Sequence, residues 1–350
     1  MPPKERRCPV WTGDALDVKP VSVLRGASVL VTGGSGSFGR AFVRYALENA
    51  VRRIVVFSRD EAKHAAMRTA ISDPRVRYFV GDVRDMDRVQ WAMRGVDLVV
   101  HAAAMKRIDS CEADPTEAIQ TNILGSQNVA LAAIQARVAR AVLLSTDKAA
   151  APCTLYGMTK ATAERAWIQS NAYADGTGTL LAATRYGNVL GSTGSVVPLW
   201  RAAAAANAPI YVTESSATRF WMPMRDAVQL VVSALTRMQG GETFVPKLGA
   251  ASVLNLLSAV VPEWRTHTVV NTGLRVGEKA HETLIGTDEA DRTVDAGEDY
   301  VICPAYSTWG DRKVRATGGL AQAVSRNFTL RSDNVDISLD VPALQAMLAE

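Results

Sequence analysis

The chain has 350 residues, 48% of them hydrophobic and 21% charged, which is typical of a globular protein with one large domain or two. Its net charge of +4 is the difference between 39 basic and 35 acidic residues that form no block of one sign, so nothing points to a nucleic acid or a membrane as partner. Apolar runs such as 202–206 and 251–261 are too short to cross a bilayer, which takes about 20 residues.

Residues 1–26 are expected to be an N-terminal extension without an evident role. They carry no long apolar stretch of the kind found in a secretory signal, and we expect a cytoplasmic protein. The cysteines stand at positions 8, 111, 153 and 303, and no two of them have CxxC spacing. This spacing predicts neither a metal site nor a disulfide framework, and reduced thiols are the simplest interpretation.

Short apolar strands alternate with helices from residue 27 to residue 190. The expected strands are 27–31, 53–57, 76–80, 96–100, 141–144 and 180–185, and the expected helices are 40–48, 60–70, 85–93, 116–137 and 156–169. This alternation predicts an α/β fold with a doubly wound parallel sheet, as in a Rossmann-like domain over residues 27–190.

The regular alternation stops after Asn188, where glycines and short segments take over. Here we expect an extended segment at 209–213, helices at 224–237, 253–259 and 342–348, and strands at 268–270, 283–285 and 300–302 that could form a small second sheet. Residues 191–350 are therefore predicted to form mainly a smaller α/β substrate-binding lobe, with some chain returning to the first domain.

A glycine-rich turn joins the first strand to the first helix. Glycine allows the tight turn and lets a pyrophosphate approach the backbone, while the start of the helix offers free N–H groups to the phosphates. The alternative is a plain loop, but the strand–turn–helix context favours dinucleotide binding. The expected cofactor contacts here are Gly33, Ser35, Gly36, Ser37, Phe38 and Gly39.

The end of the second strand should contact the adenosine ribose. Arg59 can pair with a 2′-phosphate and Ser58 can donate a hydrogen bond to it, with Lys63 close by. Asp60 keeps NAD possible, because an acidic residue accepts from the 2′-hydroxyl, or else it caps the next helix. We predict NADP. Further cofactor contacts are expected from Asp82 and Val83 after the third strand and from Ala102, Ala103 and Ala104 after the fourth.

Tyr156 and Lys160 are four residues apart on the expected helix 156–169, so they share one face. Such a pair is common on exposed helices, but this one follows the strand next to the expected cofactor. A nearby ammonium is expected to lower the pKa of the tyrosine. Tyr156 could then take a proton from a sugar hydroxyl as hydride leaves for the nicotinamide, and Lys160 could also hold the nicotinamide ribose.

A second acid and amine, Asp147 and Lys148, follow Thr146 at the end of the strand 141–144. They could form an exposed ion pair in a turn. Simple oxidoreduction needs only the tyrosine and the lysine of the helix, however, so this pair suggests a second proton transfer. Once a sugar 4-hydroxyl is oxidised, the neighbouring C5 proton becomes acidic. A Lys148 whose pKa is lowered by burial could remove it, and a protonated Asp147 could donate to a departing 6-hydroxyl.

With these residues the chain resembles an extended short-chain dehydrogenase/reductase, and within that superfamily the inverting UDP-N-acetylglucosamine 4,6-dehydratases of the pseudaminic acid pathway. The resemblance covers roughly residues 26–350. It rests on the segments 32–39, 58–61, 81–85, 101–106, 145–149, 155–160, 185–189, 194–198, 218–221, 244–247 and 275–279. The Asp147–Lys148 pair matches the inverting subfamily, whereas retaining enzymes typically have Asp-Glu there. Thr154, Met158 and Thr193 depart from the usual pattern.

The resemblance implies NADP as cofactor, UDP-N-acetylglucosamine or a related UDP-sugar as substrate, and a homo-oligomer. It also implies the roles of several residues outside the cluster. Arg219 and Arg275 would contact the diphosphate and Glu278 the uridine ribose. Asn188 and Val196 would hold the sugar nucleotide, and Lys106 would face both cofactor and substrate.

Two alternatives stay open from the sequence. A UDP-sugar 4-epimerase needs the tyrosine and the cofactor but not the chemistry of Asp147 and Lys148. A non-catalytic NADP-sensing protein would bind the cofactor without any catalytic residue, and the intact Tyr156 and Lys160 argue against it.

Overall fold

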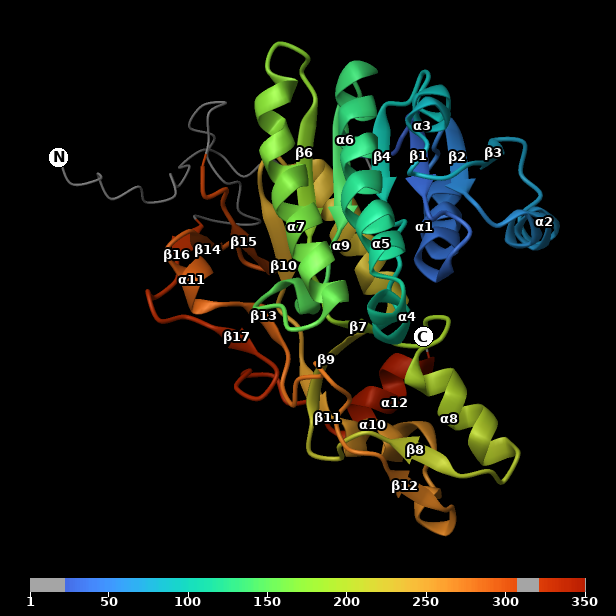
Figure 1. Ribbon diagram of the computed structural model, residues 1–350, viewed down its shortest axis with the longest axis vertical. Helices are drawn as coiled ribbons and strands as arrows, with labels where there is room; N and C mark the ends of the chain where they lie inside the picture. The colour runs from blue at the N-terminus through green and yellow to red at the C-terminus, as the bar shows by residue number, and fades with distance from the viewer. Residues whose placement is uncertain (1–22, 307–320, 350) are drawn as a thin grey trace.

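A ten-stranded sheet forms the centre of the computed structural model, which describes residues 23–306 and 321–349. Its strand order is β16-β14-β15-β10-β6-β5-β4-β1-β2-β3, and Figure 1 shows it standing upright between layers of helices. The run from β3 to β6 has the 3-2-1-4-5-6 order of a Rossmann fold. The predicted fold class is therefore confirmed.

Seven parallel strands make up most of this sheet. They are β1 (Ser28–Thr32), β2 (Arg53–Ser58), β3 (Val76–Val80), β4 (Leu98–His101), β5 (Arg140–Leu144), β6 (Leu180–Thr184) and β10 (Thr243–Pro246). Along β1, Val29 and Val31 belong to one core cluster and Leu30 to the other, since successive side chains point to opposite faces. Both faces of the sheet are thus buried.

Helices cover the two faces of the sheet. On one side lie α1 (Ser37–Glu48), α2 (Glu61–Ala70) and α9 (Met224–Arg237), and on the other α3 (Met86–Ala92), α6 (Gly125–Gln135) and α7 (Leu155–Gln169). In Figure 1 α6 and α7 stand in front of the strands and α9 lies behind them. This covering explains why the parallel strands are continuous apolar runs.

The helix predicted at 116–137 is interrupted. It consists of α5 (Pro115–Ala118), the π-helix η2 (Ile119–Leu124) and α6, and the short helix α4 (Ile108–Ala113) precedes it. The π-turn brings the Asn122 side chain to the main chain of Met105, where Oδ1 accepts from the amide at 2.8 Å and Nδ2 donates to the carbonyl at 3.0 Å. A local π-turn of this kind often accompanies a functional site.

The strands predicted to form one small second sheet belong instead to three sheets. β15 (Asp299–Ile302) joins the main sheet antiparallel to β10, followed by β14 (Thr293–Asp295) and β16 (Gln322–Ala323). β12 (Val269–Asn271) pairs with β8 (Ile210–Val212), and β13 (Thr283–Ile285) pairs with β17 (Leu330–Arg331). The prediction of one shared sheet is wrong, because each strand finds its partner elsewhere in the chain.

A second, smaller group of elements lies at the carboxyl ends of the parallel strands, below the sheet in Figure 1. It contains α8 (Val196–Ala205), α10 (Val253–Val260) and α12 (Val341–Ala349), which share one apolar cluster. A three-stranded sheet of β7 (Asn188–Val189), β9 (Thr218–Met222) and β11 (Ala250–Ser252) connects this lobe to the main sheet.

Two further observations concern the whole chain. Cys111 and Cys153 are free, whereas Cys303 is disulfide-bonded, so the prediction of reduced thiols is wrong for that residue. Among residues 23–306 and 321–349, no helix combines the length and the apolar character needed to span a membrane.

Candidate active site

Asp147 lies at the turn where β5 ends and the 3₁₀-helix η3 (Asp147–Ala149) begins. Its side chain is fully buried. Oδ1 accepts hydrogen bonds from the Thr146 hydroxyl at 2.8 Å and from the Lys148 ammonium at 3.1 Å. Oδ2 is buried and has no hydrogen-bond partner within the described chain. One carboxylate oxygen therefore holds the amine, and the other is buried without a partner among the described residues.

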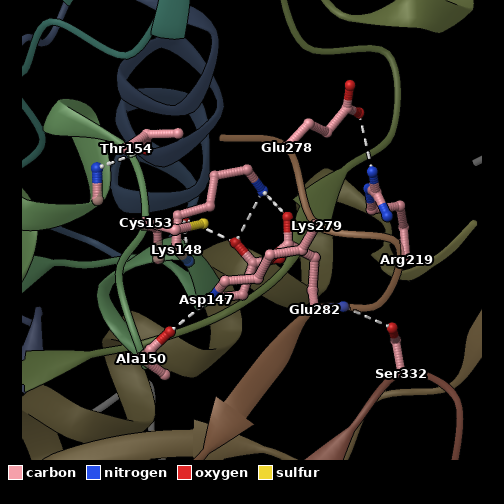
Figure 2. A network of polar contacts seen from close by, with 12 residues as sticks. Asp147, Lys148, Ala150, Cys153, Thr154, Arg219, Glu278, Lys279, Glu282 and Ser332 are labelled. Atoms are coloured by element: carbon pink, nitrogen blue, oxygen red, sulfur yellow. Dashed lines mark hydrogen bonds and ion pairs between the residues drawn. The ribbon is translucent and has the colours of Figure 1, made fainter. Parts of the chain in front are cut away.

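Lys148 has a second acidic neighbour that the sequence analysis missed. The Glu282 Oε1 atom lies 3.2 Å from the Lys148 Nζ atom, so the ammonium sits between two carboxylates (Figure 2). Glu282 directly precedes β13, which packs against η3. No local signal in the sequence links these two residues, because they come from distant segments.

The pKa of Lys148 differs from the expectation. Burial on its own favours the neutral amine, but the carboxylates of Asp147 and Glu282 outweigh burial and raise the pKa above its usual value. The expected lowering is therefore wrong for the protein without ligands. Lys148 is an ammonium here, and it must lose a proton before it can act as a base.

Tyr156 lies in the first turn of α7, close to η3. The start of α7 is fixed by Thr154, whose Oγ1 accepts from the Gly157 amide at 3.1 Å, and by Glu112, whose Oε1 accepts from the Leu155 amide at 2.7 Å. A Cβ atom at Gly157 would lie 2.4 Å from the Lys148 carbonyl oxygen. The glycine thus allows the helix to approach the turn that carries Asp147 and Lys148.

The Tyr156–Lys160 pair does not act as predicted. Burial raises the pKa of Tyr156 to about 12, and the nearby Lys148 ammonium and Thr146 hydroxyl counteract this only in part. The Lys160 ammonium donates to the Leu144 carbonyl at 2.7 Å, and burial lowers its pKa to about 8. The cation that favours the phenolate is Lys148 on η3, and the pKa of Tyr156 is raised rather than lowered as predicted.

The glycine-rich turn between β1 and α1 is shaped by close backbone contacts. Gly33 has a φ of +64°, and a Cβ there would lie 2.8 Å from the Ala102 carbonyl; at Gly39 a Cβ would lie 2.4 Å from Gly34. Gly36 caps α1 without any side-chain hydrogen bond, so the first amides of the helix stay open to an anion. These features fit the pyrophosphate of a dinucleotide.

Hydrogen bonds tie the turn to the neighbouring segments. The Ser35 hydroxyl lies 2.7 Å from that of Ser58, and the Ser37 hydroxyl lies 2.7 Å from that of Thr193. The Lys106 ammonium donates to the Thr193 carbonyl at 3.0 Å, so Lys106 lies beside this turn. Phe38 packs against the core on the α1 side of the sheet.

The residues expected around the adenosine group lie together at the ends of β2 and β3. Asp60 caps α2, where its side chain accepts from the Lys63 amide and pairs with the Lys63 ammonium at 2.8 Å. Arg59 is half exposed and lies 3.6 Å from Asp82. The capping role that the sequence left open for Asp60 is thus present, and the exposed cation beside it is Arg59.

A buried polar chain passes beneath Ala102–Ala104, and the sequence analysis did not foresee it. The His101 ring joins the Thr32 hydroxyl at 2.6 Å to the Ser126 hydroxyl at 2.9 Å and stacks on Trp167. Burial lowers the pKa of His101 to about 3, so the ring is neutral. This chain fixes the loop after β4 from below.

Several expected substrate contacts lie on the lobe side of the cluster. Arg219, on β9, donates to the Glu278 carboxylate at 2.8 Å, and the Arg275 amide donates to the same carboxylate at 3.2 Å. Asn188 pairs with Trp221 between β7 and β9, and Val196 begins α8. The structure therefore brings Arg219, Arg275 and Glu278 together.

Next to these residues is a pocket of about 400 Å³. It is lined by Tyr211, Thr213, Thr272, Gly273, Leu274 and Arg275. Two contacts join the lobe to the segment that follows Lys148: Lys279 donates to the Ala150 carbonyl at 2.9 Å, and the Cys153 thiol donates to the Gly277 carbonyl at 2.9 Å (Figure 2).

The comparisons with known proteins agree with this geometry. A family model described as polysaccharide biosynthesis protein matches residues 29–304. The chain belongs to this family. It is 40% identical over 317 residues to the inverting UDP-N-acetylglucosamine 4,6-dehydratase of Campylobacter jejuni subsp. jejuni serotype O:23/36 (strain 81-176), covering 89% of this chain and 94% of the relative.

Two further members show the breadth of this similarity. A UDP-glucose 4-epimerase of Rickettsia canadensis (strain McKiel) is 40% identical over 280 residues, covering 79% of this chain and 82% of the relative. The solved structure of Pen from Bacillus thuringiensis has a TM-score of 0.83 at 32% identity, covering 93% of this chain and 99% of that one. The resemblance to extended short-chain dehydrogenases/reductases and to the inverting dehydratases is thereby confirmed.

Proposed function

We propose that the protein is an NADP-dependent UDP-N-acetylglucosamine 4,6-dehydratase, a lyase that inverts C5. Its product would be a UDP-2-acetamido-2,6-dideoxy-hexos-4-ulose. The observation that carries the proposal is the hydrogen bond of 3.1 Å from the Lys148 ammonium to the buried carboxylate of Asp147. Elimination needs an amine without its extra proton and a carboxylic acid with one, and this contact links the two groups directly.

A single proton shift prepares both groups. When a proton passes from Lys148 Nζ to Asp147 Oδ1, an N–H bond breaks, an O–H bond forms, and no solvent proton is needed. Lys148 then takes the C5 proton of the 4-keto sugar, and Asp147 gives its proton to the departing 6-hydroxyl, which leaves as water. The ammonium and the carboxylate are restored at the end of this step. C5 later takes a solvent-derived proton on the opposite face, and Tyr156 releases the proton of the 4-hydroxyl to solvent.

Tyr156 serves the first step in this proposal, in which it takes the proton of the 4-hydroxyl. Bound NADP supplies the acceptor for the C4 hydride and its return to C6, and the positive charge of the oxidised ring favours the phenolate. Thr146 and Lys148 face the phenol from the protein side and favour the phenolate as well. Lys160, held by the Leu144 carbonyl, lies one helical turn further on, where it can bind the nicotinamide ribose.

The choice of NADP over NAD rests on Arg59 and Asp60. The Asp60 carboxylate is occupied by the start of α2, which leaves it poorly placed to accept from a 2′-hydroxyl, whereas Arg59 is 52% exposed. Replacing Arg59 by Ala should weaken NADP binding on the order of tenfold or more and leave NAD binding nearly unchanged, since only NADP has a phosphate for a bidentate contact. Calorimetric titration of both nucleotides measures this, and equal losses for the two would contradict the choice of NADP.

In this proposal residues 27–190 hold the cofactor and residues 191–350 mainly hold the UDP-sugar. Arg219 and Arg275 would pair with the diphosphate, and Glu278, Asn188 and Val196 would contact the rest of the nucleotide sugar. The contact between Arg219 and Glu278 supports this assignment, because it presents the arginine at the edge of the catalytic cluster. A homo-oligomer remains a prediction of the family resemblance, and a cytoplasmic location remains a prediction from the N-terminal sequence and the cysteine pattern.

A UDP-sugar 4-epimerase is the second candidate, and the Rickettsia relative with that name favours keeping it. The two activities differ in mass balance. A dehydratase converts UDP-N-acetylglucosamine into a product lighter by one water, and an epimerase gives an isomer of equal mass. Mass spectrometry of the products decides between them. Replacing Lys148 by Ala should abolish the loss of water, whereas an epimerase would largely survive that substitution.

A further inference from the structure

Glu282 is a buried carboxylate that the steps above do not use. Its side chain is 3% exposed, and Oε1 lies 3.2 Å from Lys148 Nζ, which also contacts Asp147 (Figure 2). Oε2 is also buried and has no hydrogen-bond partner among the residues described. A carboxylate buried at such a cost normally has a cation to compensate, and the cation here is Lys148.

The main chain of Glu282 is held independently of Lys148. The Glu282 amide donates to the Ser332 hydroxyl at 2.9 Å, and the Ser332 amide donates back to the Glu282 carbonyl at 2.9 Å. The Ser332 hydroxyl in turn donates to the Thr218 carbonyl at 3.0 Å. The carboxylate therefore has a fixed position to which the flexible lysine side chain is drawn.

The charges in the cluster change during the proposed elimination. After the proton shift, Asp147 is neutral and no longer balances a positive charge on Lys148. When the C5–H bond breaks, the lone pair of Lys148 Nζ binds the proton, and Lys148 becomes an ammonium. The sugar keeps the electron pair of the broken C–H bond. At that moment Glu282 is the carboxylate within contact distance of Nζ that is still ionised.

We propose that Glu282 is the positioning residue of the catalytic lysine: it fixes Nζ and compensates the positive charge that Nζ gains as it takes the C5 proton. The arrangement follows the general logic of a base that is oriented and stabilised by a buried carboxylate. This inference rests on the proposed function. It deepens that function by assigning a third group to the elimination step, supplied by the lobe rather than by the parallel sheet.

The test compares the full-length wild type with Glu282→Gln, a substitution of nearly the same shape without the charge. Each enzyme is incubated with NADP and UDP-N-acetylglucosamine in D₂O, and two signals are followed: deuterium at C5 by NMR and the absorbance of reduced nicotinamide. We expect the rate of C5 labelling to fall on the order of 10²-fold, because general-base catalysis contributes about that much. We also expect reduced nicotinamide to accumulate, because oxidation at C4 does not use Glu282.

Two further variants keep the result unambiguous. Glu282→Asp retains the charge and should recover part of the lost rate. Ser332→Ala removes a hydroxyl that holds the same main chain but keeps the carboxylate and the second main-chain bond, so it should not accumulate reduced nicotinamide. If Glu282→Gln labels C5 at the wild-type rate, or if Ser332→Ala shows the same accumulation, the inference is overturned.

The wild type separates this inference from the proposed function. If the wild type forms no 6-deoxy-4-keto sugar, the proposed function fails and Glu282 has no such step to support. If the wild type forms that product and Glu282→Gln forms it equally fast, only the role of Glu282 fails. If a melting curve shows that Glu282→Gln does not fold, Glu282→Asp is compared with the wild type instead. Its carboxylate lies one methylene further back, so C5 labelling at the full wild-type rate would count against the inference.

Discussion

Lys148 and Lys160 are both buried amines, yet their pKa values move in opposite directions. Lys148 lies against two carboxylates, which raise its pKa, whereas Lys160 donates to a carbonyl, so burial prevails and lowers its pKa to about 8. Burial alone therefore does not determine the charge of a lysine. An ionised carboxylate in contact with the amine determines the direction of its pKa shift. Lys148, on η3, is therefore an ammonium that keeps its proton, whereas Lys160, on the neighbouring helix α7, loses its proton more easily.

The low pKa of Lys160 makes stability depend on pH. The folded chain releases this proton near pH 8, while the unfolded chain holds it up to about pH 10.5. The unfolded state therefore binds more protons between these values, and this contribution to stability rises with pH across that window. In the cofactor-free protein, the stability of the wild type relative to Lys160→Met should increase by roughly 3 kcal/mol between pH 7.5 and pH 10.5.

Urea unfolding of both proteins at a series of pH values measures this difference. Using the difference cancels the titration of all other groups that the two proteins share. A wild-type advantage that stays constant or falls as the pH rises would show that Lys160 is not the neutralisable amine described above.

At the scale of elements, the first six parallel strands could be predicted to within about two residues, because each is a short apolar run between helices with clear end signals. The seventh, β10, was not predicted. The glycine turn and the Asp147–Lys148 turn could be predicted for the same reason, as both directly follow a strand. The interruption of the helix at Ile119–Leu124 could not, since a π-turn keeps the same apolar pattern.

Long-range pairings could not be predicted from the sequence either. The strand at 299–302 pairs not only with its neighbour β14 but also with the distant β10, and Glu282 reaches Lys148 only because β13 packs against η3. Neither contact leaves a local pattern. The direction of the pKa shift of Lys148 was mispredicted for this reason, as its second carboxylate could not be foreseen.

The glycine turn yields a prediction at this scale. An Ala at position 39 would place its Cβ 2.4 Å from the Gly34 backbone, so the start of α1 must move away from the end of β1. Gly39→Ala should destabilise the protein by about 1–3 kcal/mol and weaken cofactor binding at least tenfold. Gly176→Ala is the control: it carries the cost of an unfavourable φ of +72°, which Gly39 lacks, but a Cβ there contacts nothing within 4 Å.

Melting curves with and without NADP measure both effects of the Gly39 substitution, since a bound ligand stabilises the native state. The control should keep the full stabilisation by NADP. Equal stabilisation of Gly39→Ala by NADP would mean that this turn does not hold the phosphates.

At the scale of the molecule, a buried ion triad joins α7, the helix that carries Tyr156, to the lobe. Arg185 follows β6 and donates both to Glu164 on α7 and to Glu289 on the short helix α11 (Thr287–Ala290). It also donates to the Leu284 carbonyl of β13 at 2.9 Å. One guanidinium thereby fixes the helix that carries Tyr156 and the strand that follows Glu282.

Removing this guanidinium should destabilise the whole protein. In Arg185→Met the carboxylates of Glu164 and Glu289 stay buried without their shared partner, and we expect a loss of roughly 3–5 kcal/mol in the free energy of unfolding. Arg107→Met, which breaks the exposed pair with Asp109, is the matched control and should hardly change the melting temperature. Similar melting temperatures for the two variants would contradict the role of the triad.

In the proposed function, one proton shared by Asp147 and Lys148 at the end of β5 prepares both the acid and the base of an elimination. The most direct measurement is NMR of the wild type with UDP-N-acetylglucosamine in D₂O. The account predicts a 6-deoxy-4-keto sugar that carries deuterium at C5 with the configuration opposite to that of the substrate. A 4-keto or 4-epimeric sugar that keeps its 6-hydroxyl, or a 6-deoxy product with protium retained at C5, would contradict it.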